Sequence, residues 1–337
     1  MLLIDAIYIN TGGGMILLEY LIENLNLCKT KVFYLLDNRI ANKNIYIKKS
    51  DRIIYMEASI YSRYKFYKKN KNVYDTVFCL GNVPPLTKLN SQVYTYFHNS
   101  IFIKVTGDFN YFDRVKYALK VFLIKKLVRN TDEWWVQTES MKNRFRVKFK
   151  EEDSRVRVLP FFSQMKNVDK NSLRSKNTYI YVSNATPNKN HLRLINAFCS
   201  FYDNYKQGKL LLTVNQDYMS VIQEINDKII LGYPIENLGY VDRNKLKEVY
   251  ESCEYIVFPS LEESFGLGLI EAIECGCKVL GADLSYTYQV CEPSIVFDPF
   301  NENSILAAFD DSLGGNIKES KVLIKNEIEC LIQKLAN

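Results

Sequence analysis

Two glutamates bracket a glycine-containing stretch in the second half of the sequence, within the run EESFGLGLIEA at residues 262–272. Glu263 precedes this stretch, and Glu271 stands eight residues later in what reads as a helix. Backbone N–H groups at the start of a helix lack intrahelical acceptors and sit at the positive end of the helix dipole, so they hold phosphate well. Carboxylates suit hydroxyl groups instead. A nucleotide sugar, which has hydroxyls at both ends and phosphates between them, fits this spacing.

The flanking residues predict the elements that would position these glutamates. Residues 254–259, EYIVFP, form an apolar strand, and in a doubly wound α/β domain ligands bind beyond the carboxyl ends of such strands. Apolar strand patterns alternate with amphipathic helical patterns along the chain, and this alternation restarts after the polar residues 163–177. The pattern predicts two Rossmann-like doubly wound α/β domains. A final helix is expected at about 318–336.

Composition agrees with a globular protein of two domains. The chain has 337 residues, of which 47% are hydrophobic and 24% charged. Its eight cysteines are scattered and it has two histidines, which favours reduced thiols over a disulfide framework or a zinc site. No apolar run approaches the roughly 20 residues that span a bilayer, and the N-terminus reads as a first strand rather than a signal peptide. We therefore expect a cytoplasmic protein without a metal.

Charge divides unevenly along the chain. Residues 1–165 carry 27 Lys and Arg against 15 Asp and Glu, a net +12, whereas residues 166–337 carry a net −6. The basic excess lies in residues 61–74 and 114–130, where aromatic and aliphatic residues interleave with lysine and arginine. This pattern suits an anionic membrane surface, where each basic residue contributes about 1 kcal/mol, although a solvated helix with one buried face is the alternative. No nucleic-acid motif is present, so nucleic acid is not expected as a partner.

The run VFPSLEESFGLGLIEAIECGCKVLGA, residues 257–282, resembles the E-x7-E signature of family 4 glycosyltransferases. These are retaining enzymes with the GT-B fold, in which two Rossmann-like domains face a cleft. The resemblance extends to LGYVDRNKLKEVYESCEYIVFPS, YVSNATPNKNHLRLINAF, YTYFHNS and WWVQTESMKNRF. It implies an acceptor-side domain at 1–163, a linker at 164–177 and a nucleotide-sugar-binding domain at 178–317. The remaining residues, 318–337, would form a helix, for which packing back on the N-terminal domain is one option.

The resemblance also implies roles for individual residues. Lys189 would stabilise the departing nucleoside diphosphate, Glu263 would hold sugar hydroxyls, and Glu271 would hold the ribose. His98 would contact the donor sugar or the departing oxygen. Many family members carry an arginine where this chain has Asn184, and Arg193 is the candidate substitute. The other implied donor-binding residues are Gly13, Gly14, Asn184, Tyr240, Ser264, Phe265, Gly266 and Leu267.

The implied activity is retaining, metal-independent transfer of a hexosyl unit from a UDP- or GDP-sugar. The resemblance is to transferases of bacterial surface polysaccharides, such as O-antigen and lipopolysaccharide, in which an asparagine variant with KN in place of KG is familiar. The acceptor would be a growing, lipid-linked saccharide. The protein would then be peripheral on the inner face of the cytoplasmic membrane.

Two other functions stay open at this stage. A sugar-nucleotide-binding scaffold without catalysis would be compatible with the missing arginine. A dinucleotide oxidoreductase would use the TGGG loop and Asp37 at the end of the second strand, but Leu17 stands where the third fingerprint glycine belongs. For two predicted site features a structural role is the alternative: His98 as a packed strand residue, and Gly12–Gly14 as an ordinary tight turn.

Overall fold

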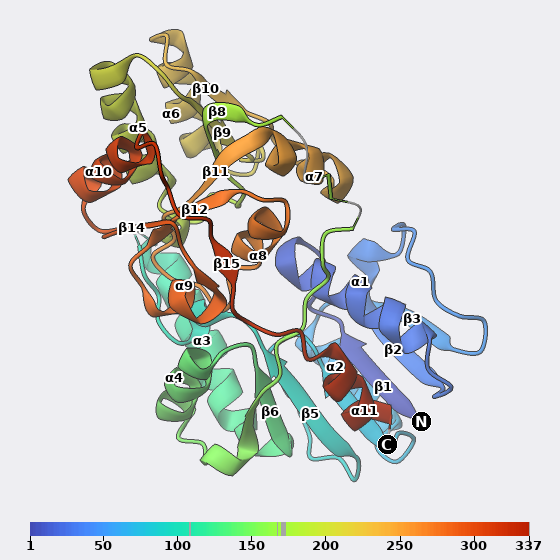
Figure 1. Ribbon diagram of the computed structural model, residues 1–337. Helices are drawn as coiled ribbons and strands as arrows, with labels where there is room; N and C mark the ends of the chain where they lie inside the picture. The colour runs from blue at the N-terminus through green and yellow to red at the C-terminus, as the bar shows by residue number, and fades with distance from the viewer. Residues whose placement is uncertain (108, 167, 170–172, 337) are drawn as a thin grey trace. The chain divides into compact units, whose positions relative to one another are not determined.

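The computed structural model describes residues 1–107, 109–166, 168–169 and 173–336. The chain forms two compact units, shown in Figure 1, and neither is continuous in sequence. The first unit comprises Met1–Ile103, Val115–Ser163 and Lys325–Asn337; the second comprises Lys104–Arg114 and Gln164–Ile324. Part of the predicted linker, at residues 167 and 170–172, lies outside the described residues.

The first unit is built on a seven-stranded parallel sheet with the order β3-β2-β1-β4-β5-β6-β7. The central strands are nearly continuous apolar runs because helices cover both faces of the sheet; all five residues of β1, for example, are buried. The strands are β1 Leu2–Ala6, β2 Val32–Asp37, β3 Arg52–Met56, β4 Thr76–Cys79, β5 Gln92–Phe97, β6 Glu133–Val136 and β7 Val156–Val158.

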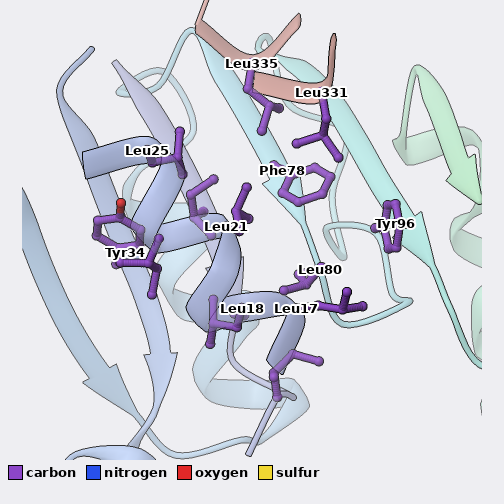
Figure 2. Packing of buried hydrophobic residues seen from close by; sticks show 14 of the residues in the cluster. Leu17, Leu18, Leu21, Leu25, Tyr34, Phe78, Leu80, Tyr96, Leu331 and Leu335 are labelled. Carbon is purple, nitrogen blue, oxygen red and sulfur yellow. The ribbon is translucent and has the colours of Figure 1, made fainter. Parts of the chain in front are cut away.

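Alternate residues of these strands face opposite helical layers. Leu2 and Ile4 point into a cluster with the buried faces of α1 and α11, whereas Leu3 points into a second cluster with α2. Figure 2 shows the first cluster, in which Leu331 and Leu335 of α11 lie over Phe78. The helices are α1 Gly12–Asn26, α2 Ile60–Lys69, α3 Tyr111–Leu127, α4 Glu139–Phe149 and α11 Ile328–Ala336.

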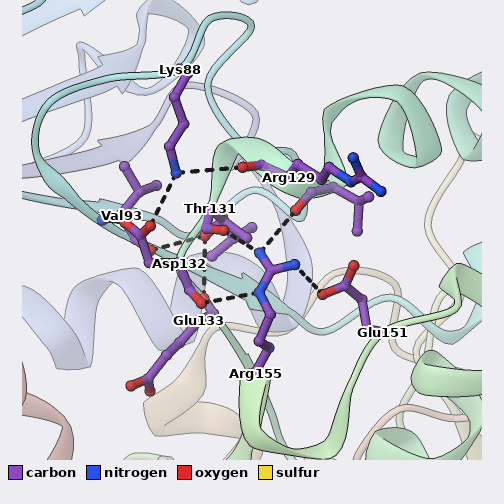
Figure 3. Close-up of polar contacts among 10 residues, drawn as sticks. Lys88, Val93, Arg129, Thr131, Asp132, Glu133, Glu151 and Arg155 are labelled. Carbon is purple, nitrogen blue, oxygen red and sulfur yellow. Dashed lines mark hydrogen bonds and ion pairs between the residues drawn. The ribbon is translucent and has the colours of Figure 1, made fainter.

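A polar network fixes the chain where α3 leads into β6 (Figure 3). Arg155 donates to the carbonyl oxygens of Thr131 at 2.5 Å and Val128 at 3.5 Å, so a cation meets carbonyl groups that follow the C-terminal end of α3. Asp132 accepts from the Val93 N–H at 2.8 Å and from Lys88 at 3.1 Å. The network therefore anchors one end of α3 to strand β5.

The second unit has a six-stranded parallel sheet with the order β10-β9-β8-β11-β12-β14 and a separate two-stranded antiparallel ribbon of β13 and β15. The strands are β8 Ser175–Tyr181, β9 Lys209–Leu212, β10 Ile235–Asn237, β11 Cys253–Phe258, β12 Lys278–Ala282, β13 Cys291–Glu292, β14 Ile295–Phe297 and β15 Lys321–Val322. The helices are α5 His191–Tyr205, α6 Met219–Ile230, α7 Arg243–Ser252, α8 Leu267–Glu274, α9 Ser285–Val290 and α10 Glu302–Ser312. The predicted fold class, two Rossmann-like α/β domains, is confirmed.

The prediction of one helix over about 318–336 is wrong in its first half. Residues Lys321–Val322 pair with β13, and the Val290 carbonyl accepts the N–H of Leu323 at 2.9 Å. The helix begins at Ile328, whose N–H donates to the side chain of Asn326. Within the described ranges, no helix combines the length and hydropathy that a bilayer crossing requires.

Candidate active site

Lys189 and Glu263 meet at the carboxyl edge of the second sheet. Lys189 follows β8 and Glu263 follows β11, and these two strands are parallel neighbours. The Lys189 Nζ lies 2.5 Å from Glu263 Oε1, and the two side chains are 18% and 12% exposed. The structure therefore brings together two of the three predicted catalytic residues in one ion pair.

Side-chain amides hold the loop of Lys189 against the loop of Glu263. The Asn188 side chain donates to the Glu262 backbone carbonyl at 3.1 Å, and the Asn188 backbone carbonyl accepts the Leu261 N–H at 2.8 Å. Asn190 adopts left-handed backbone angles, with φ of 62°, and donates to the Pro259 carbonyl at 3.2 Å. Asparagine tolerates this conformation. Asn190, which follows Lys189, therefore adopts the turn that glycine would allow, and its side chain adds a hydrogen bond that glycine could not make.

The turn before α8 contains the residues predicted to bind an anion through their backbone. Gly266 is the N-cap of this helix, with φ of 86° in the left-handed region that favours glycine. The helix starts at Leu267, and the N–H groups of a first turn have no intrahelical acceptor. Ser264 and Phe265 precede the cap, and Phe265 is buried at 3% exposure. The arrangement suits an anion placed above the helix start.

Glu271 lies inside the fold rather than on its surface. It is 4% exposed, and burial raises the pKa of its carboxyl to about 7. Its Oε1 lies 3.2 Å from Nη2 of Arg243 but has no hydrogen-bond partner among the described residues. A Cβ on Gly268 would make ordinary van der Waals contact, at 3.4 Å from the Phe258 ring and 3.6 Å from the Tyr250 hydroxyl.

Three further predicted residues lie apart from these contacts. Asn184 is exposed and accepts a hydrogen bond from Thr186 at 3.2 Å. Tyr240 is 84% exposed. The guanidinium of Arg193 donates to Asn190 Oδ1 at 2.5 Å and to the Pro299 carbonyl at 3.4 Å. These contacts give Arg193 a role in bracing the loop that carries Lys189.

The remaining predicted residues belong to the first unit. Helix α1 begins at the glycine run, where a Cβ on Gly12 or Gly13 would meet nothing within 4 Å. A Cβ on Gly14 would lie 3.2 Å from Ile9 and 3.3 Å from Cε1 of His98. The structure thus places Gly14 directly against His98, and the predicted histidine contacts the predicted glycine loop.

His98 is half-buried and held by its neighbours along β4 and β5. Its Nε2 lies 2.9 Å from the Leu80 carbonyl, and its backbone N–H donates to Asn82 Oδ1 at 2.7 Å. Burial lowers the pKa of the imidazole to about 4, partly offset by the hydrogen bond to Leu80. The ring is therefore neutral at pH 7, with Nε2–H directed at a carbonyl oxygen.

The residues that would support a dinucleotide fingerprint are engaged elsewhere. Asp37 is fully buried, and its carboxylate accepts hydrogen bonds from the side chain and backbone of Arg39 at 2.5 to 3.0 Å. Leu17 is buried in the core of the first unit. These contacts leave Asp37 as an anchor for its own loop, which weighs against the oxidoreductase alternative.

Sequence reasoning missed Asn82, Asn188 and Arg243. A weak signal existed for Asn82, because the Gly-Asn pair after β4 is a turn signature. Arg243 stands 28 residues before Glu271, and no spacing rule joins residues of two different helices. The contact between them depends on how each helix packs on the sheet, where both α7 and α8 contact β11.

Residues 163–329 match the family model described as Glycosyl transferases group 1. This part of the chain is a group 1 glycosyltransferase domain. The match includes Lys189, Glu263, Arg243 and Glu271, so the geometry described for the second unit is the geometry of that domain. Placement in family 4, with the E-x7-E motif as its signature, stays a prediction.

Curated relatives of the glycosyltransferase domain match over short stretches. The serotype-specific mannosyltransferase WbdA of Escherichia coli is 32% identical over 76 residues, which cover 22% of this chain and 9% of that protein. The O-antigen chain mannosyltransferase B of Escherichia coli is 34% identical over 80 residues, which cover 23% of this chain and 21% of that protein. The chain thus spans less than a quarter of the length of either relative.

Solved structures match almost the whole chain. Sucrose-phosphate synthase from Thermosynechococcus elongatus superposes with a TM-score of 0.72 at 19% identity, covering 93% of this chain and 89% of that chain. HepE of Anabaena, in complex with UDP and glucose, gives a TM-score of 0.67 at 11% identity, with coverage of 93% and 89%. At such identities the likeness concerns the fold alone. The predicted GT-B fold is confirmed.

Proposed function

We propose that the chain is a retaining glycosyltransferase that moves a hexosyl unit from a nucleoside-diphosphate sugar to a saccharide of the bacterial cell surface. The observation that carries this proposal is the Lys189–Glu263 pair beside the start of α8, within a group 1 glycosyltransferase domain. The names of the relatives support the surface-polysaccharide part of the proposal, since both are mannosyltransferases and one is named for the O-antigen chain.

Lys189 and the first turn of α8 would hold the diphosphate. In the transfer, the bond from the anomeric carbon to the phosphate oxygen breaks as the acceptor oxygen bonds to that carbon. The nucleoside diphosphate leaves with additional negative charge, and the proton of the acceptor hydroxyl passes to the departing phosphate oxygen. A fixed ammonium group and helix N–H groups stabilise that charge without reorganising. We therefore expect turnover to persist in EDTA, and a loss of activity restored by Mg²⁺ would contradict this expectation.

The two glutamates would bind hydroxyls at opposite ends of the donor. Glu263 is already paired with Lys189, so donor binding would exchange part of this contact for phosphate on the lysine and sugar hydroxyls on the carboxylate. Glu271 has a buried oxygen without a hydrogen bond among the described residues, which a ribose hydroxyl would satisfy. The pair thus accounts for two separate donor contacts.

His98 would contribute a hydrogen bond rather than a charge. Its pKa of about 4 keeps the imidazole neutral through the physiological range, so it is not a cation that could pair with phosphate. Gly14 lets the first turn of α1 approach the ring. We propose that this face of the first unit contacts the donor sugar or the departing oxygen.

The deciding experiment is a thermal-shift panel of UDP, GDP, ADP, CMP, dTDP and NAD on the wild type and on Glu271→Ala. A ligand at 100 times its dissociation constant stabilises the folded state by about 2.7 kcal/mol. We expect UDP or GDP to stabilise the wild type and to have a much smaller effect on the variant. Stabilisation by NAD alone, or by none of the six, would refute the assignment.

Turnover separates an enzyme from a binding scaffold. The names of the relatives make GDP-mannose a first donor to test, followed by UDP-glucose because HepE was solved with UDP and glucose. Release of nucleoside diphosphate from either donor, with or without acceptor, supports catalysis. Tight donor binding with no release across acceptors would favour the scaffold.

Helix α3 is the surface that supports association with a membrane. Val115, Leu119 and Phe122 repeat at helical spacing and are 39%, 65% and 59% exposed, whereas Ile124 and Leu127 are buried. Lysines flank the exposed apolar stripe, at Lys116, Lys125 and Lys126. An apolar stripe edged with cations is suited to an anionic lipid surface. We therefore propose that the acceptor is lipid-linked and that the protein is peripheral on the inner face of the cytoplasmic membrane.

Liposome flotation tests this surface directly. We expect the wild type to float with vesicles containing about a third phosphatidylglycerol and to stay behind with neutral vesicles, because each lysine near an anionic surface contributes about 1 kcal/mol. The double variant Leu119→Ser, Phe122→Ser should lose flotation. Leu27→Ser, which changes another exposed apolar residue, is the control. Equal flotation on neutral vesicles would overturn the proposed charge dependence.

A further inference from the structure

The carboxylate of Glu271 occupies a position that opposes its own ionisation. Its side chain is 5% exposed, and burial raises its pKa to about 7, with Glu274 adding to the rise. A protonated carboxyl has one fewer acceptor site for hydroxyl groups than a carboxylate. If Glu271 is to accept hydrogen bonds from a ligand near neutral pH, another group must favour its charged form.

Arg243 is the cation that faces this carboxylate. Its Nη2 lies 3.2 Å from Oε1 of Glu271 and favours the ionised carboxyl, which lowers the pKa. The contact is an ion pair, yet Oε1 still has no hydrogen-bond partner among the described residues. The other titratable groups that interact with Glu271 are the Tyr250 hydroxyl, the Cys275 thiol and the Glu274 carboxyl. None of these three is a cation.

Arg243 is the first residue of α7, whereas Glu271 lies in the second turn of α8. Asp242 caps α7, and its Oδ1 accepts the N–H of Asn244 at 3.1 Å and of Lys245 at 3.2 Å, which fixes the backbone beside Arg243. The Tyr250 hydroxyl lies beside Gly268 of α8, 3.6 Å from where a Cβ would stand, and it is also buried without a hydrogen-bond partner among the described residues. Glu271 Oε1 and the Tyr250 hydroxyl are thus two buried polar atoms without hydrogen-bond partners among the described residues. Such atoms are typical of a site that a polar ligand completes.

We propose that Arg243 is a positioning residue of the donor site, whose guanidinium favours the ionised form of Glu271 and orients this carboxylate to accept hydrogen bonds from the ribose diol of the donor. The inference rests on the proposed function, because it takes Glu271 as the ribose ligand. Arg243 acts through Glu271, and its side chain is 32% exposed at the edge of the pair.

Calorimetric titration with GDP and UDP at pH 6.5 and pH 8.5 tests this role. We expect Arg243→Met to bind the preferred nucleotide about tenfold more weakly than the wild type at pH 6.5. The deficit should shrink at pH 8.5, where Glu271 ionises without help. Arg243→Lys should recover most of the loss. Lys245→Met is the matched control, because Lys245 is an exposed cation on the same helix.

A ligand-free readout separates this inference from the proposed function. The carboxyl signal of Glu271, identified by its loss in Glu271→Gln, can be followed by ¹³C NMR across pH in the free protein. We expect a higher titration midpoint in Arg243→Met than in the wild type. An unchanged midpoint overturns the inference, as does tighter nucleotide binding by Arg243→Met, which would make Arg243 a block. If the wild type binds no nucleoside diphosphate but the titration midpoint of Glu271 is still higher in Arg243→Met than in the wild type, only the proposed function is refuted.

Discussion

Lys189 is the residue on which the proposed chemistry depends most. Replacing it by methionine keeps much of the side-chain volume but leaves the Glu263 carboxylate, 12% exposed, without its ion-pair partner. Removal of a charge-stabilising donor from an active site typically lowers kcat by about 10²- to 10³-fold. We expect a loss of that size in Lys189→Met, measured as release of nucleoside diphosphate. Lys206→Met, on an exposed cation of the same unit, should leave kcat unchanged.

Glu271 predicts a pH dependence of stability. Its folded pKa of about 7 lies above the ordinary value of 4.5, so the folded state keeps a proton that the unfolded chain releases. Stability therefore falls as pH rises from about 4.5 to 7. Glu271→Gln should remove this fall. At pH 8 its free energy of unfolding should exceed that of the wild type by up to about 3 kcal/mol, so the variant should melt at a higher temperature. Parallel melting curves for the two proteins between pH 5 and pH 8 would contradict the buried-acid description.

At the scale of elements, the start of α1 separates two roles of neighbouring glycines. A methyl group on Gly13 meets nothing within 4 Å, so Gly13→Ala should stabilise the helix by up to about 1 kcal/mol. A methyl group on Gly14 meets Ile9 and His98 at 3.2 and 3.3 Å, so Gly14→Ala must shift these side chains by a few tenths of an ångström. We expect both variants to lose activity, but only Gly13→Ala to melt higher than the wild type. Full activity in Gly13→Ala would show that ligand binding does not require glycine at this position.

Some strands and contacts of the second unit could be predicted from the sequence, and others could not. The strands β8 and β11 were predictable because the short apolar runs TYIYV and EYIVFP alternate with helical patterns. Parallel strands end at the same edge of their sheet, which places Lys189 and Glu263 at that edge. The segment Lys321–Val322 was predicted as helix because its pairing with β13 depends on partners 29 and 31 residues away. The Arg243–Glu271 contact was missed for the same reason, since it joins residues of two helices that both pack on β11.

Across the whole molecule, α11 ties residues near the end of the chain to the core of the first unit. Leu331 is fully buried against that core, and replacing such a residue by alanine costs about 2 to 5 kcal/mol. In Leu331→Ala we expect faster hydrogen exchange in α1 and β1, with β8 and β11 unaffected. Leu323→Ala, at a residue 55% exposed, is the control. Faster exchange confined to α11 itself would show that the first unit does not depend on this helix.

The discontinuity of the first unit has a consequence during synthesis. Residues up to Ser163 leave the ribosome early, but α11, which covers Phe78 and its neighbours, follows only after the whole of Gln164–Ile324. At translation rates of about 5 to 20 residues per second, the apolar face stays uncovered on the nascent chain for on the order of ten to thirty seconds. That interval makes the unfinished first unit a substrate for chaperones that bind exposed apolar surface.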